Sequence, residues 1–230
     1  MSASLDILFE DERLIAINKP HGLLVHRTHI AADAQEFALQ LVRNYVGQRV
    51  YPVHRLDRKT SGVLLFAKDQ KMNRDVHKLF MEGKVIKEYH ALVRGFLPDS
   101  GEIDYPIGED HKKKEAITQF KLLHHYELDL PFGKWDTSRY SEVLLKPITG
   151  RFHQLRKHMA HIFHPILGDR PHGCNKQNKL WKERFNMVNM MLCATTLTIP
   201  YQGNPLVIKS ECSDEYKRMV SIMEELQCSQ

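Results

Sequence analysis

The sequence lacks the features that define several broad classes of protein. It has no apolar run long enough to cross a membrane. Acidic residues between Asp6 and Glu12 occupy the region where a signal peptide would be basic and then apolar. The four cysteines lie far apart without a CxxC pair, so they predict free thiols rather than a disulfide framework or a zinc site. These absences predict a cytoplasmic protein that does not enter a membrane.

Sites for nucleotides and metals find no support either. No glycine-rich loop ends in GKS or GKT, and no GxGxxG follows a strand. The histidines His153, His158, His161 and His164 suggest metal binding as one hypothesis, but they form no HExxH pattern and have no thiolates nearby. A helical wheel scatters these side chains around a helix. We therefore expect no metal, and histidines on the helix surface where some of them contact phosphate.

The positive charge of the chain is concentrated in two zones. The 230 residues carry a net charge of +5, whereas residues 151–184 alone carry +6 and residues 54–87 carry +5. Two basic zones favour a single cationic cleft that faces a polyanion such as nucleic acid. A basic surface that only maintains solubility is the alternative. The apolar fraction of 42% argues against disorder and for a folded core.

One carboxylate, Asp57, lies among basic residues directly before a strand-like apolar run. It belongs to the segment HRLDRKTSG at residues 54–62, and VLLFA follows at residues 63–67. Cations this close should keep the Asp57 carboxylate ionised. An ionised aspartate at the edge of an ordered strand is a candidate nucleophile or proton acceptor. The alternative is a turn aspartate that its basic neighbours merely neutralise.

Arg156 is the second candidate residue. It lies in TGRFHQLR at residues 149–156, which opens a helix predicted to run from residue 152 to residue 163. An apolar arc of Phe152, Leu155, Met159, Ile162 and Phe163 is expected to face the core, with Arg156 at its edge. A guanidinium turned toward a core needs an anionic partner. We therefore predict an Asp57–Arg156 pair that lines a cleft; alternatively, Arg156 extends along the core edge to water.

The pattern of strands and helices predicts an α+β fold with a mixed sheet, because strands and helices do not alternate regularly. We expect one catalytic domain over residues 1–230, and a polar, basic, mobile loop at residues 175–186. A helix should begin near residue 34 and stop at Gly47, and Asp69 should cap the next one. Strands are predicted at residues 5–9, 14–17, 63–67, 85–95, 103–107, 116–123, 140–145, 190–198 and 206–209, and a last helix at 214–226.

Six ordered motifs make the sequence similar to the RluA-type pseudouridine synthases. They are NKPxG at residues 18–22, HRLD with TSG at 54–62, KEYHALVRG at 87–95, AxT at 116–118, KPxTGRxHQLR at 146–156 and HPILGD at 164–169. The resemblance implies the catalytic fold of that family, a mostly antiparallel sheet flanked by helices around a central RNA-binding cleft. It also implies an isomerase that needs no cofactor. We expect a monomer without an RNA-binding domain ahead of residue 5.

The resemblance assigns roles to individual residues. Asp57 matches the catalytic aspartate, Arg156 its basic partner, and Tyr89 the tyrosine that stacks on uracil. Tyr89 would otherwise be read as a core strand residue. Arg55 matches the arginine that fills the space of the extruded nucleotide. Lys19 is expected to be structural or phosphate-facing. The RNA-binding residues predicted in the two basic zones are Arg55, Arg58, Lys59, Arg151, His153 and Lys157.

Several alternatives remain open. The length and residues 18–27 bring the chain closest to family members that modify uridine 65 in the T-arm stem of tRNA, but rRNA, alone or with tRNA, is the alternative substrate. A non-catalytic RNA-binding or RNA-folding protein and a metal-dependent RNA hydrolase are hypotheses from other classes. The family mechanism is either nucleophilic attack or proton abstraction to a glycal. Cys193 replaces a family histidine, and it receives no catalytic role.

Overall fold

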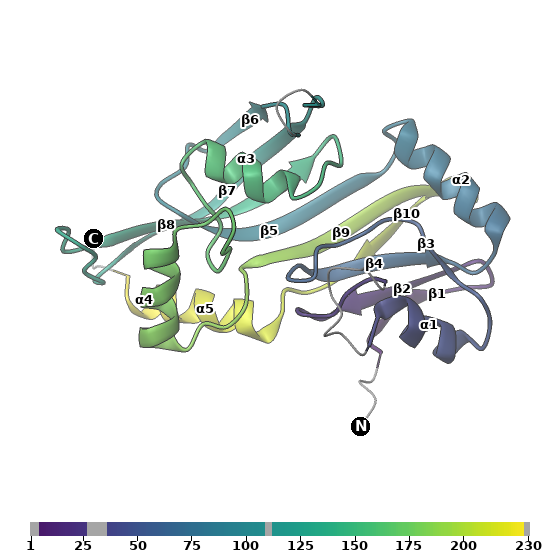
Figure 1. Cartoon of the computed structure of the whole chain (residues 1–230), viewed down its shortest axis with the longest axis horizontal. Helices are drawn as coiled ribbons and strands as arrows, with labels where there is room; N and C mark the ends of the chain where they lie inside the picture. Colours follow the sequence, from purple (N-terminus) through teal and green to yellow (C-terminus); the bar gives the residue numbers. More distant parts are fainter. Residues whose placement is uncertain (1–4, 27–35, 109–111, 228–230) are drawn as a thin grey trace. The chain divides into compact units, whose positions relative to one another are not determined.

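The computed structural model describes residues 5–26, 36–108 and 112–227 (Figure 1). The chain forms two compact units. Unit 1 consists of Met1–Lys87 and Ala194–Glu211, and unit 2 consists of Glu88–Cys193 and Cys212–Gln230. Each unit is therefore assembled from two separate stretches of sequence. Both contain antiparallel strands together with helices, which confirms the predicted α+β class.

Unit 1 is built around the strand that follows Asp57. This strand is buried at every position, as its continuous apolar run predicts for the centre of a sheet. The strand at Leu14–Lys19 pairs antiparallel with the strand at Ser61–Ala67, with Leu14 opposite Ala67 and Lys19 opposite Gly62. The order in the sheet is β1 (Ile7–Glu10), β2 (Leu14–Lys19), β4 (Ser61–Ala67) and β9 (Leu192–Tyr201), while β3 (Tyr51–Pro52) pairs with β4 and β10 (Asn204–Lys209) with β9.

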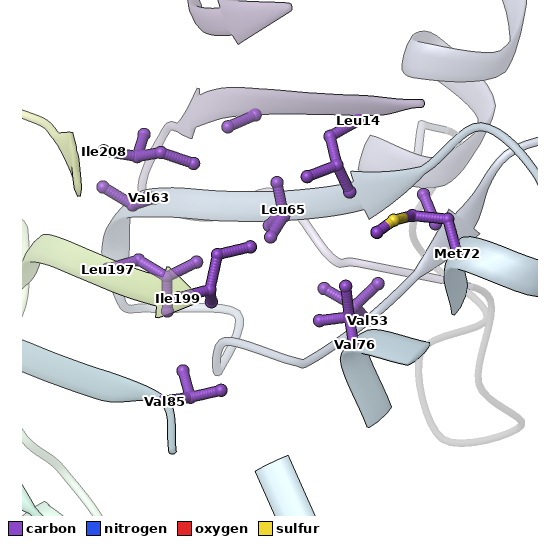
Figure 2. Close-up of a cluster of buried hydrophobic side chains, with 12 residues drawn as sticks. Leu14, Val53, Val63, Leu65, Met72, Val76, Val85, Leu197, Ile199 and Ile208 are labelled. Carbon is purple, nitrogen blue, oxygen red and sulfur yellow. The ribbon is translucent and has the colours of Figure 1, made fainter. Parts of the chain in front are cut away.

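The described part of unit 1 also contains two helices; the end of the first and the start of the second are formed as their sequence signals predict. Helix α1 (Ala38–Val46) ends at Gly47, whose φ of 73° suits glycine. The start expected near residue 34 lies outside the described residues. Helix α2 (Gln70–Met81) begins after Asp69, whose side chain accepts a hydrogen bond of 2.7 Å from the Met72 amide. Figure 2 shows the core against which α2 packs: Leu14, Ala16, Val53, Val63, Leu65, Ala67, Met72, Val76, Val85, Leu197, Ile199 and Ile208.

Among its described residues, unit 2 contains an antiparallel sheet and three helices. Its strands follow the order β5 (Ile86–Arg94), β8 (Ser138–Pro147), β7 (Ile117–Leu128) and β6 (Ser100–Asp104). The helices are α3 (Gln154–His161), α4 (Asn175–Phe185) and α5 (Asp214–Glu225). Helix α5 begins where predicted, because the Ser213 hydroxyl accepts a hydrogen bond from the Tyr216 amide. A second apolar core joins strands β5, β7 and β8 to α4 and α5, and it includes the fully buried side chain of Trp181.

Three structural expectations were wrong. The segment 175–186 was predicted as a mobile loop, but Asn175–Phe185 forms α4 and Asn186 caps its end. The burial of Trp181 stabilises this helix, whose remaining residues are mostly polar. Helix α3 is shorter than predicted, so Phe152 and Phe163 lie beyond its ends and are 57% and 88% exposed instead of facing the core. His158, expected on the helix surface, is fully buried, and its Nε2 lies 3.0 Å from the Tyr105 carbonyl oxygen.

Candidate active site

Asp57 lies in the loop between β3 and β4 of unit 1, and this loop is tied to β4. The Val53 amide donates to the Leu65 carbonyl at 3.2 Å, and the Leu65 amide donates to Nε2 of His54 at 3.1 Å. The buried side chain of Leu56 anchors the residue directly before Asp57. The Thr60 amide closes the turn by donating to the Asp57 carbonyl at 3.0 Å. The backbone at Asp57 is therefore fixed by β4, which is itself fully buried.

The NKPxG turn holds the same loop from its other side. Nζ of Lys19 donates to the carbonyl oxygens of Pro20, Leu23 and Arg58 at 2.9, 2.8 and 3.2 Å. The Gly22 amide also donates to the Arg58 carbonyl, and Nε of Arg58 donates to the Gly22 carbonyl. Because Arg58 directly follows Asp57, these bonds position the carboxylate through the backbone. The turn and the HRLD segment are one structural element.

Lys19 is fully buried, so it cannot contact phosphate, and the structural half of its expected role is the correct one. Burial lowers the pKa of the Lys19 ammonium to about 7, and the negative charge of Asp57 acts in the opposite direction. The two side chains are thus electrostatically coupled within unit 1. The three hydrogen bonds from the Lys19 ammonium to carbonyl oxygens hold the loop in place.

Arg156 of unit 2 has a carboxylate partner, Asp169, that was not predicted from the sequence. Nε and Nη2 of Arg156 donate to the two carboxylate oxygens of Asp169 at 2.8 and 2.7 Å. The side chains are only 5% and 1% exposed. This bidentate geometry is the strong form of an arginine–carboxylate pair, and it fixes the plane of the guanidinium. Asp169 ends the HPILGD motif, which was the available signal for this contact.

The HPILGD segment also runs beside β5, the strand that carries Tyr89. The Leu167 amide donates to the Leu92 carbonyl at 3.0 Å, and the Arg94 amide donates to the Pro165 carbonyl at 3.1 Å. Tyr89 is largely buried and lies opposite Leu145 of β8. Unit 2 therefore holds both Tyr89 and the Arg156–Asp169 pair on one hydrogen-bonded framework.

Gln154 organises the basic segment before α3. Its Oε1 accepts from the Thr149 hydroxyl at 2.7 Å and from the Arg151 amide at 2.9 Å, and its Nε2 donates to the Ile117 carbonyl. The buried Gln154 amide therefore joins the TGR turn to β7. Sequence reasoning assigned Gln154 no role, although it is part of the TGRxHQLR motif.

Two of the predicted RNA-binding residues of unit 2, His153 and Lys157, lie beside the exposed ring of Phe152. Arg151 is exposed, and its Nε donates to the Glu115 carbonyl. The ring of His153 stacks on that of Phe152 with 3.8 Å between centroids, and Nζ of Lys157 lies 5.8 Å from the Phe152 centroid. Cations beside an exposed ring can contact both phosphate and base.

In unit 1, Arg55 and Arg58 are exposed and Lys59 is half-buried, all next to Asp57. The structure thus brings Asp57, Lys19 and these cations together in unit 1, and Tyr89, Arg156 and Asp169 together in unit 2. Within the described ranges no three His, Cys, Asp or Glu side chains are grouped to bind a metal ion. No helix in the same ranges is long and apolar enough to span a bilayer.

Comparison with known proteins identifies the family. A family profile described as RNA pseudouridylate synthase matches residues 13–161. The tRNA pseudouridine synthase C of Vibrio cholerae serotype O1 is 40% identical over 231 residues, which cover 94% of this chain and 95% of that protein. The protein of the same name from Haemophilus ducreyi is 45% identical over 204 residues, 84% of each chain.

Solved structures agree on the fold. Human RNA Pseudouridylate Synthase Domain Containing 4 has a TM-score of 0.73 at 25% identity and covers 95% of this chain and 93% of its own. Human RNA Pseudouridylate Synthase Domain Containing 1 has a TM-score of 0.73 at 23% identity and covers 99% and 97%. The chain belongs to the RNA pseudouridylate synthase family and is an isomerase that converts uridine in RNA to pseudouridine.

Proposed function

We propose that the protein modifies tRNA, at uridine 65 in the T-arm stem. The observation that carries this proposal is the identity of 40% to relatives named tRNA pseudouridine synthase C, along nearly the whole chain. The two basic zones suit a phosphate backbone, and binding should weaken steeply with salt as counterions are released. The proposal includes a monomeric enzyme that acts in the cytoplasm.

The conversion of uridine to pseudouridine is an isomerisation that needs no external source of energy, but it requires a group that acts on the nucleotide. The bond between C1′ and N1 of uridine breaks, a bond between C1′ and C5 forms, the proton at C5 is lost and N1 gains one. We assign Asp57 as the group that loosens the sugar–base bond, by attack on the nucleotide or by accepting a proton. The hydrogen bonds of Lys19 to the Arg58 carbonyl and of the Leu65 amide to His54 hold the loop that carries Asp57 in place. They support this assignment, because a carboxylate in a fixed position needs no reorganisation during the reaction.

Arg156 and Tyr89 are proposed to complete the catalytic set. Arg156, whose guanidinium plane is fixed by Asp169, would pair with the Asp57 carboxylate. Tyr89 would stack on the uracil while it turns. Extrusion of a paired uridine costs a few kcal/mol of stacking and pairing. Arg55 would offset part of that cost by filling the vacated space, and the other predicted RNA contacts would do so by binding phosphates.

The test compares Asp57→Asn with the wild type. The variant should bind tRNA with unchanged affinity and form no pseudouridine, because the carboxylate is lost while the loop and its backbone bonds remain. Asp75→Asn, an exposed aspartate on α2 of the same unit, is the matched control and should keep full activity. Strong activity of Asp57→Asn would contradict the assignment.

The substrate is tested by mapping pseudouridine in total tRNA and rRNA after incubation with the purified protein. Product confined to the T-arm stem supports the proposal, and product in rRNA alone refutes the tRNA assignment. Tight RNA binding without any product would favour a non-catalytic RNA-binding protein. Turnover in the presence of EDTA should equal turnover without it, and loss of activity would favour a metal-dependent enzyme instead.

A further inference from the structure

A pocket of about 490 Å³ lies in unit 2 at the turn that joins β7 to β8. This turn can be followed in Figure 1 from the end of β7 to the start of β8. The pocket is bounded by the turn, the end of β5 and the first turn of α4. The lining residues that matter here are Arg94, Phe132, Trp135, Asp136, Arg139 and Gln177. None of them has a role in the catalytic set proposed above.

The turn presents aromatic side chains on a fixed backbone. The amides of Phe132 and Trp135 each donate to the carbonyl of the other, at 2.9 and 3.2 Å. Trp135 nevertheless leaves 64% of its surface exposed, so its ring does not serve the core. An exposed tryptophan on an ordered turn offers a broad flat surface with little conformational entropy to lose on binding.

Cations surround these rings. The Arg94 guanidinium lies 5.9 Å from the Phe132 centroid, and Nζ of Lys134 lies 5.0 Å from the Trp135 centroid. Arg139 is held in place by two hydrogen bonds of 3.1 Å to Oε1 of Glu127. Asp136 is the acidic residue among the lining side chains. The combination favours a ligand that has a planar ring and a negative charge.

A buried amide adds a polar group to the wall. Gln177 is 3% exposed and lines the pocket. Its Oε1 accepts a hydrogen bond from the Tyr140 hydroxyl, which in turn accepts from Nε1 of Trp181 at 2.9 Å. This chain of bonds fixes the amide so that Oε1 is used inside the protein. Within the described part of the chain Nε2 of Gln177 donates to no protein acceptor, so it can donate to a carbonyl or ring nitrogen of a ligand.

We propose that this pocket binds one unpaired nucleotide, with its base stacked on Trp135, its base edge at Gln177 and its phosphate at Arg94 and Arg139. The source of the nucleotide is an unpaired residue of the RNA substrate, and this part of the inference rests on the proposed function. The pocket would thereby recognise a part of the RNA that is not base-paired, in addition to the uridine that is modified.

The experiment measures RNA affinity by fluorescence anisotropy at one fixed salt concentration. Loss of a stacked base weakens binding by about 5-fold to 150-fold. Trp135→Ala should therefore weaken binding of a single-stranded oligonucleotide and of tRNA within that range, and Trp135→Phe should restore most of the affinity. Binding of a blunt RNA duplex should not change. Tyr45→Ala removes an aromatic side chain of α1 that is 56% exposed, and it is the control expected to have no effect.

These outcomes separate the inference from the proposed function, because affinity is measured without product formation. Equal weakening for single strand and duplex, or no weakening at all, would overturn the nucleotide pocket. A titration with AMP, GMP and UMP tests the free nucleotides. If a mononucleotide binds in a Trp135-dependent manner while tRNA affinity is unchanged, the assignment to RNA is overturned. Pseudouridine formation that fails while Trp135-dependent binding persists would refute only the proposed function.

Discussion

Removal of the Asp169 carboxylate tests how the protein holds the buried guanidinium of Arg156. Both side chains are almost fully buried, and two short hydrogen bonds join them. Removal of one partner from a buried ion pair costs about 3–5 kcal/mol, because a charge remains in a medium of low polarity. We expect Asp169→Ala to lower the free energy of unfolding by that amount. Asp169→Asn keeps the shape and one acceptor, and it should cost about 2 kcal/mol.

Urea unfolding followed by circular dichroism measures these differences. Glu127→Ala is the control, because it breaks the exposed Arg139–Glu127 pair of the same unit and should cost at most about 1 kcal/mol. The double variant Arg156→Met/Asp169→Leu should be more stable than Asp169→Ala alone, since apolar residues replace both charges. If Asp169→Ala costs no more than Glu127→Ala, the guanidinium reaches water and the reasoning is refuted.

The same pair has a consequence for catalysis if the proposed function holds. Asp169 would be a positioning residue that acts through Arg156. Asp169→Asn should then lower kcat while KM for tRNA stays nearly constant, because the base and phosphate contacts are unaffected. A rise in KM with unchanged kcat would contradict this role.

Three further predictions concern unit 1. Burial lowers the pKa of Lys19 from 10.5 to about 7 on folding, so between these pH values the unfolded chain binds a proton that the folded protein does not, and the free energy of unfolding rises with pH. The stability of the wild type relative to Lys19→Met should therefore increase by about 2 kcal/mol between about pH 7.5 and 9.5. A difference that does not change with pH would refute this prediction. Burial, and to a smaller extent the positive charge of Lys87, lowers the pKa of His54 from 6.5 to about 4. The free energy of unfolding of the wild type relative to His54→Gln should therefore fall by about 2–3 kcal/mol as the pH drops from 6.5 to about 4. Urea titrations at each pH measure this difference. Gly62 has a φ of 107°, and a methyl group added there would overlap the Ala194 carbonyl, so Gly62→Ala should lower the free energy of unfolding by more than about 3 kcal/mol in thermal denaturation. Gly47 has a φ of 73° and open space around it, so the control Gly47→Ala should cost about 1–2 kcal/mol.

Local signals in the sequence were sufficient for much of the fold. Asp69 at the start of α2 and Gly47 at the end of α1 have the predicted roles, because a cap depends on neighbours within one helical turn. The strand after Asp57 was equally predictable, since a continuous apolar run bounded by turn residues fits a buried strand. The ends of strands were harder to predict. Strand β7 continues to Leu128 although its predicted end was residue 123, and β6 begins at Ser100 although its predicted start was residue 103.

The sequence by itself also determined the family and the candidate residues, because six motifs occur in a fixed order. Only the tertiary structure decided which partners those residues have. The carboxylate of Asp169 binds Arg156, and Lys19 is buried against three carbonyls, through contacts between segments that no local pattern relates. Helix α4 forms for the same reason: its polar sequence has little apolar periodicity, and the burial of Trp181 in a core made by distant strands and helices stabilises it.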